Sequence, residues 1–210
     1  MSKETRKVFE ESLRDKFKAR FAKDKYIKVK KNKITIDKSA NGCGELYLQY
    51  SVSGKGYILH VFVDLPEFTN FLEMHEVNYK TRSSPIGAKS FAYSLLTLNK
   101  SDENNFSGDD YGTVRLPDML DEVPAVVDYV YDKIMTIYIE RIMDILLYKE
   151  NAIYNVIKHP VNYSYPFLFI VFVLQKNNLK KIDGVDLWAL AADSNFGNIE
   201  FNQKVLKQIS

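Results

Sequence analysis

The chain has 210 residues, of which 46% are hydrophobic and 27% charged, and 29 basic residues nearly balance 27 acidic ones. This is an ordinary globular composition, and a chain of this length buries about 70% of its unfolded surface. The single cysteine, Cys43, excludes an internal disulfide framework and most structural zinc sites. With only three histidines as well, we expect no metal and no cofactor.

The ends and the most apolar run predict a cytoplasmic protein without membrane contact. The N-terminus is charged throughout and has no apolar core of signal-peptide length. The most apolar run, Tyr165–Leu174, is shorter than the stretch of about 20 residues that crosses a bilayer as a helix. We expect this run to be a buried element, most plausibly a helix.

The first half of the chain predicts a helix followed by an antiparallel meander. Apolar residues recur every four positions between Lys3 and Lys23, which is the pattern of one buried helix face. Alternating patterns then predict four strands joined by short turns, at Tyr26–Lys30, Lys33–Asp37, Glu45–Val52 and Tyr57–Asp64. We predict a tight turn at Lys31–Asn32 between the first two strands, because Asn tolerates left-handed backbone angles. A weaker alternation over Ser90–Leu98 predicts a fifth strand.

The second half predicts helices. Pro66 opens a short helix, and Pro124 begins a long one that runs to about Glu150. Further helices are expected over Asn151–His159 and Ile199–Ile209. A block of strands followed by a block of helices indicates the α+β class. We expect a single domain over residues 1–210, with a helix-plus-sheet part at 1–98 and a helical part at 114–210. The wide apolar arc of the long helix is also compatible with a homodimer.

Charge is distributed unevenly along the chain. Residues 1–38 hold 14 basic and six acidic residues, a net charge of +8. Residues 101–132 hold one basic and nine acidic residues, a net charge of −8. The acidic segment overlaps an expected loop, Asn99–Thr113, that is rich in Asn, Ser, Gly and Asp.

Three interpretations of the acidic segment are open. Its carboxylates can stabilise the positive ends of helix dipoles, or they can form a docking surface for a basic partner. A metal-binding loop is the third, although the spacing of a calcium-binding EF-hand is absent. The acidic and basic segments can also face each other within one molecule.

The basic segment supports an alternative hypothesis, nucleic-acid binding. Such a site needs a basic stripe with aromatic side chains for stacking. Tyr26 and Tyr47 are candidates for stacking. The candidate basic residues are Lys16, Lys18, Arg20, Lys23, Lys28, Lys30 and Lys31.

No common catalytic motif is present. The sequence lacks GxSxG, HExxH, CxxC and a phosphate-binding GxxxxGK[ST] loop. His60 and Asp64 lie four residues apart on one predicted strand and therefore share a face, so a base and the carboxylate that orients it would define an enzyme hypothesis. A histidine on the solvent side of the sheet is the simpler interpretation.

The layout resembles the small cytoplasmic α+β immunity proteins of bacterial polymorphic and contact-dependent toxin systems. A Lys-rich first helix precedes a meander (ITIDKSANGCGELYLQYSV, YILHVFVDLPEF), and an acidic segment enters helices (LPDMLDEVPAVVDYVYDKI). The resemblance carries over no functional residue. It implies a non-enzymatic protein that binds and neutralises a basic toxin domain. The expected partner-binding residues are Asp102, Glu103, Phe106, Asp109, Asp110, Tyr111, Asp118, Asp121 and Glu122, with Phe106 and Tyr111 as apolar anchors.

Overall fold

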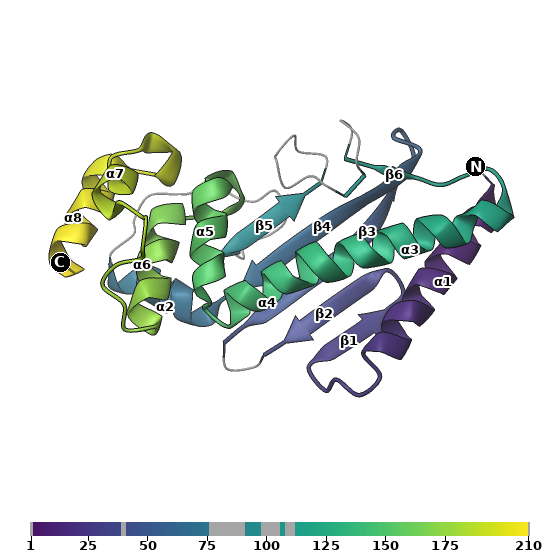
Figure 1. Cartoon of the computed structure of the whole chain (residues 1–210), viewed down its shortest axis with the longest axis horizontal. Coiled ribbons are helices and arrows are strands. Elements are labelled where there is room, and N and C mark those ends of the chain that lie inside the picture. Colours follow the sequence, from purple (N-terminus) through teal and green to yellow (C-terminus); the bar gives the residue numbers. More distant parts are fainter. Residues whose placement is uncertain (1, 39–40, 76–90, 98–105, 108–111, 210) are drawn as a thin grey trace. The chain divides into compact units, whose positions relative to one another are not determined.

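The computed structural model confirms the α+β class and describes residues 2–38, 41–75, 91–97, 106–107 and 112–209 (Figure 1). The chain forms two compact units. The first comprises residues 1–39, 43–62 and 95–143, and the second comprises residues 40–42, 63–94 and 144–210. The expectation that the whole chain is a single domain stays a prediction.

The first unit begins with helix α1 (Lys3–Arg20), which ends three residues before the expected boundary. The Ser2 hydroxyl accepts a hydrogen bond from the Thr5 backbone N–H, and the Thr5 side chain accepts one from the Ser2 backbone N–H. This reciprocal capping box satisfies two donors that would otherwise lack partners. Phe9, Leu13 and Phe17 form the buried face of α1, as their spacing predicts.

The sheet has six antiparallel strands, in the order β1–β2–β3–β4–β5 with β6 paired to β4. Their bounds are β1 (Ile27–Lys30), β2 (Lys33–Asp37), β3 (Cys43–Ser51), β4 (Gly56–Asp64), β5 (Tyr93–Leu96) and β6 (Val114–Arg115). The sequence did not predict β6 because two residues carry no periodicity. Pairing of Val114 and Arg115 with Tyr57 and Gly56 defines this strand.

The turn between β1 and β2 differs from the prediction in which residue has the left-handed backbone angle. The positive φ of 46° is at Lys31 rather than at Asn32. Asn32 instead donates a side-chain hydrogen bond to the Leu48 carbonyl and accepts one at its backbone carbonyl from the Leu48 N–H. Since Asn32 is bound to the neighbouring strand, the unusual backbone angle falls on Lys31.

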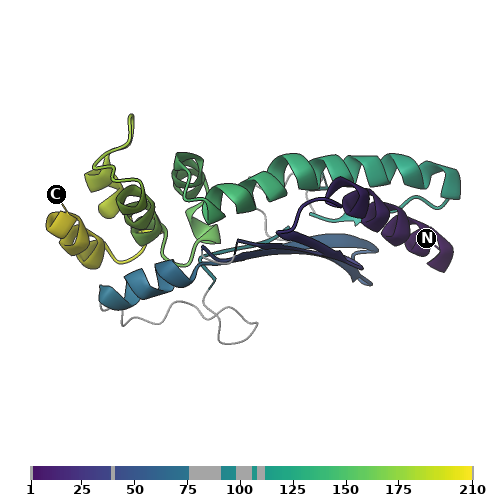
Figure 2. The same cartoon turned by 90° about the horizontal axis from the view of Figure 1, so that it is seen from below.

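A long helical run lies beside α1 on the same face of the sheet (Figure 2). It consists of a short 3-10 turn η1 (Leu120–Glu122), α3 (Val123–Lys133), a π-helical segment η2 (Ile134–Ile139) and α4 (Glu140–Leu146). The run ends four residues before the expected Glu150. Its apolar arc is buried within the chain at Val127, Val130, Ile134, Tyr138, Ile142 and Ile145. The run therefore needs no second copy to cover it, although a homodimer stays a prediction.

The second unit is helical and is built around α6 (Pro166–Lys176). Its remaining elements are α2 (Pro66–Met74), α5 (Glu150–Lys158), the 3-10 turns η3 (Pro160–Asn162) and η4 (Ser194–Phe196), α7 (Leu187–Ala191) and α8 (Ile199–Ile209). Every residue from Pro166 to Leu174 is buried, which confirms the predicted buried helix. Phe68 and Phe71 of α2 contact the ring of Phe172 in α6 at centroid distances of 5.2 and 5.5 Å.

At Gly44 of β3, the sheet lies very close to Ile142 of the long helical run. A Cβ atom at this position would lie 2.2 Å from Cγ2 of Ile142, a stiff β-branched side chain. We expect Gly44→Ala to destabilise the protein by about 1–3 kcal/mol through overpacking. Ile142→Ala alone should cost about 2–5 kcal/mol because it opens a cavity.

The double variant should be more stable than the sum of the two single changes predicts, because each change relieves the other. Urea unfolding of all four proteins measures this coupling. Additive effects would show that Gly44 and Ile142 are not in contact.

Candidate functional site

The acidic end of the first unit consists of Asp118, Met119, Leu120, Asp121 and Glu122, which cover η1 and the two residues before it. All five are exposed. Buried Leu116 and Val123 flank this segment and attach it to the core on both sides. The acidic end is therefore a short exposed segment held at its two ends.

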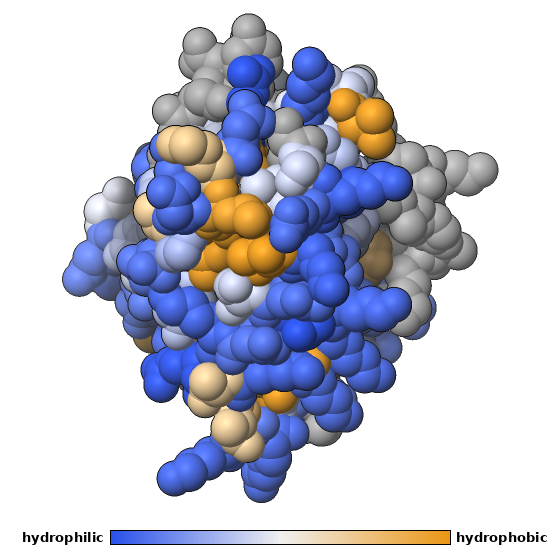
Figure 3. Space-filling model, turned by 90° about the vertical axis from the view of Figure 1, so that its right-hand side faces the viewer, coloured by the Kyte–Doolittle hydropathy of each residue, from blue (hydrophilic) through white to orange (hydrophobic). Residues whose placement is uncertain are grey.

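The acidic end includes two exposed apolar residues. Met119 is 57% exposed and Leu120 is 41% exposed, between acidic neighbours. Figure 3 looks onto this end of the first unit and shows an apolar patch bordered by hydrophilic side chains. An exposed apolar pair bordered by charge has the composition that an interaction surface requires.

Capping does not explain the acidic residues. Neither η1 nor α3 has a side-chain hydrogen bond at its N-cap, positions occupied by Met119 and Glu122. Within the described ranges, Asp121 and Glu122 also have no ion-pair partner. Their carboxylates are therefore available to a partner, and any contribution to the helix dipole is through space.

The structure describes only one of the other predicted partner-binding residues, Phe106. Asp102, Glu103, Asp109, Asp110 and Tyr111 lie outside the described residues. Phe106 is wrong as an exposed anchor, because its side chain is 0% exposed and packs edge-on against Tyr138 at 6.2 Å. A lone aromatic in a polar segment gives no periodic signal that could have indicated this burial.

The acidic and basic segments do meet within one molecule. Asp128 of α3 accepts a hydrogen bond from the Lys16 ammonium at 2.5 Å. This contact, and the charge of Asp132, raise the pKa of Lys16 above its ordinary value. Both partners are exposed, so solvent screens the pair and its contribution to stability is small. One of the candidate nucleic-acid contacts is thus already used inside the fold.

The predicted basic stripe is split by the sheet. Val29 lines a cavity beneath α1, and strand residues alternate between faces, so Lys28 and Lys30 point to the opposite side of the sheet. The two candidate stacking rings are also occupied. Tyr26 lies under Lys25 and Lys38, and Tyr47 stacks on His60 at 4.3 Å. The predicted basic residues are therefore divided between the two faces of the sheet, and nucleic-acid binding through them stays a prediction.

A different basic set gathers at a groove between α1 and the β1–β2 turn. Its cations are Lys3, Arg6, Lys7 and Arg14 of α1 together with Lys31 of the turn. The spacing 3, 6, 7, 14 places the helical members on one side of α1. The helical members of this set were recognisable in the sequence, because their spacing places them on one polar side of the predicted helix.

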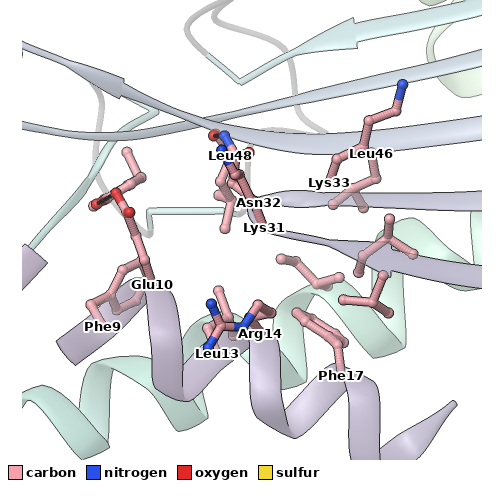
Figure 4. Close-up of a pocket in the computed structure, with 14 residues that line it drawn as sticks. Phe9, Glu10, Leu13, Arg14, Phe17, Lys31, Asn32, Lys33, Leu46 and Leu48 are labelled. Carbon is pink, nitrogen blue, oxygen red and sulfur yellow. Dashed lines mark hydrogen bonds between the residues drawn. The ribbon is translucent and has the colours of Figure 1, made fainter. Parts of the chain in front are cut away.

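A small apolar cavity of about 20 Å³ lies beneath this groove. Figure 4 shows Phe9, Leu13 and Phe17 of α1 facing Leu46 and Leu48 of the sheet across it. The volume is about that of one water molecule, and the lining is apolar. The cavity is a packing defect next to the groove rather than a ligand pocket.

His60 is buried among side chains that hold it in place. Its side chain is 8% exposed, stacks on Tyr47 and shares a 2.8 Å hydrogen bond through Nε2 with the Gln49 amide oxygen. Burial lowers the pKa of His60 below its ordinary value. A carboxylate partner would raise this pKa instead. The observed contacts favour a structural histidine over the base of a His60–Asp64 pair.

Among the described residues, no three His, Cys, Asp or Glu side chains are placed to hold a metal ion, and no helix is long and apolar enough to cross a membrane. No known family model, curated protein or solved structure matches the chain.

The titration of His60 distinguishes the two interpretations of this residue. We expect an NMR titration to give His60 a pKa below 6.5 that Asp64→Asn leaves unchanged. Because the unfolded state then binds more protons, His60 stabilises the fold above pH 6.5, and this contribution is lost as the pH falls through the folded-state pKa. A pKa above 6.5 that drops in Asp64→Asn would restore the catalytic pair.

Proposed function

We propose that the protein binds a basic protein partner through the acidic end, and that this partner is a toxin domain that it neutralises by occlusion. The exposed Met119–Leu120 pair between acidic residues carries the proposal. Apolar side chains that insert into a partner supply most of the affinity of an interface, while charges at the rim supply encounter rate and selectivity.

The geometry of the acidic end supports this role. Leu116 and Val123 attach both ends of the segment to the core, so little conformational entropy is lost when it binds. Its carboxylates lie on both sides of the apolar pair in sequence. Met119 and Leu120 replace Phe106 as the anchors of the interface. The toxin class of the partner rests on the resemblance of the whole layout to immunity proteins.

Two variants separate the charged and apolar contributions. Asp121→Asn with Glu122→Gln should slow association with the captured partner about tenfold and weaken its salt dependence. Met119→Ser with Leu120→Ser should accelerate dissociation about tenfold or more, because it removes the anchors. Surface plasmon resonance from about 50 to about 300 mM salt measures both rates.

Asp183→Asn with Glu73→Gln is the matched control, since it removes the same two charges from exposed positions of the second unit. The partner is first captured from the native source with the tagged protein. It should be basic, should arrest growth when expressed alone, and should be neutralised by co-expression of this protein. Equal rates for the control and both test variants, or a partner that is not basic, would overturn the proposal.

A further inference from the structure

The groove between α1 and the β1–β2 turn concentrates positive charge. It is an open hollow of about 550 Å³, and five cations line it against two carboxylates, Glu10 and Glu11. All of these residues belong to the first unit. A volume of this size is within the range of small-molecule sites, about 300–1,000 Å³.

The positive charge is only partly neutralised within the fold. Glu10 accepts a hydrogen bond from the Tyr57 hydroxyl at 2.5 Å and lies 3.8 Å from Arg6, and Arg14 pairs with Asp15. Within the part of the chain that the structure describes, Lys3, Lys7 and Lys31 have no carboxylate at ion-pair distance. The groove thus presents three uncompensated ammonium groups.

Arg6 is held in place at the groove. Its guanidinium lies 3.8 Å from the centroid of the Tyr50 ring, and Glu10 approaches it from the next turn of α1. An oriented guanidinium loses little entropy when it binds an anion. Because Arg6 covers Tyr50, this ring is not open for a nucleobase to stack on that face.

This arrangement is locally unfavourable for the fold. Lys3 and Arg6 lie within the first four residues of α1, where the helix dipole disfavours cations. Lys31 has a φ of 46°, a conformation that Asn or Gly adopts more easily. Local choices that oppose stability without a structural gain are typical of functional sites.

We propose that this groove binds a ligand that carries several phosphate groups in a row. The helical cations extend from Lys3 to Arg14, about 16 Å along α1, so consecutive phosphates match them better than a single anionic group does. A free polyphosphorylated molecule and the backbone of a single-stranded nucleic acid share this chemistry. Binding would be independent of base sequence.

The test uses two probes and the intact protein. Inorganic tripolyphosphate is titrated by calorimetry, and a labelled oligothymidylate of about 12 nucleotides by fluorescence anisotropy, first at low salt. The test variant is Lys7→Gln with Lys31→Asn, which keeps α1 intact and places a tolerant residue at the positive φ. The matched control, Lys18→Gln with Lys23→Asn, removes the same charge from exposed positions in the last turn of α1 and just after it.

We expect at least one probe to bind the wild type and the control, and the test variant to bind it at least about fivefold more weakly, since one such ion contact in water is worth about this factor. For the oligonucleotide, the slope of log affinity against log salt should fall by about 1.4 in magnitude, because two phosphate contacts are lost. The tighter probe identifies the source of the phosphates.

A stability measurement separates loss of the site from loss of the fold. The Tm of the test variant should equal or exceed that of the wild type, because the variant relieves charge repulsion and backbone strain. The proposal is overturned if neither probe binds at low salt, or if both variants weaken binding equally. It is also overturned if a poly-glutamate peptide of equal charge binds as tightly as the phosphate probes.

Discussion

The apolar face of α1 is the constraint on which the first unit depends. Phe9, Leu13 and Phe17 must be buried, and they meet the sheet at Leu46 and Leu48. Once this face is fixed, the rotation of the helix determines the position of every other side chain on it. Lys16 then lies beside α3, and the polar flank of α1 lies beside the β1–β2 turn. One burial requirement thus sets the electrostatic layout.

This layout explains how a nearly neutral chain keeps two charged surfaces. The basic and acidic segments have net charges of +8 and −8, and they meet where α1 and α3 pack together. The Lys16–Asp128 pair uses part of each charge at this contact. The remaining charge is concentrated elsewhere, at the acidic end and at the groove. The two proposed binding surfaces therefore carry the charge that is not paired between α1 and α3.

Both surfaces contain residues that the fold alone does not require. Met119 and Leu120 expose apolar area that a polar turn would avoid, and Lys31 adopts a backbone angle that suits a smaller residue. By contrast, the buried arc of the long helical run and the rings of the second unit are explained by packing. This difference is the physical basis for proposing the acidic end and the groove, rather than His60, as functional surfaces.

The sequence by itself determined the elements whose signals are local. Four-residue spacing predicted α1, alternation predicted five of the six strands, and a continuous apolar run predicted the buried α6. The exposed acidic residues of η1 were also recognisable, because a cluster of like charges is seldom buried.

Only the tertiary structure decided which side of an element is covered. It buried Phe106 against Tyr138, turned Lys28 and Lys30 away from α1, and created β6 by pairing two residues with β4. It also brought Lys31 to the polar flank of α1, which defines the groove. Periodicity reports whether one face of a segment is apolar, but the neighbour that covers the face comes from a distant part of the chain. Contacts of that kind leave no pattern in the local sequence.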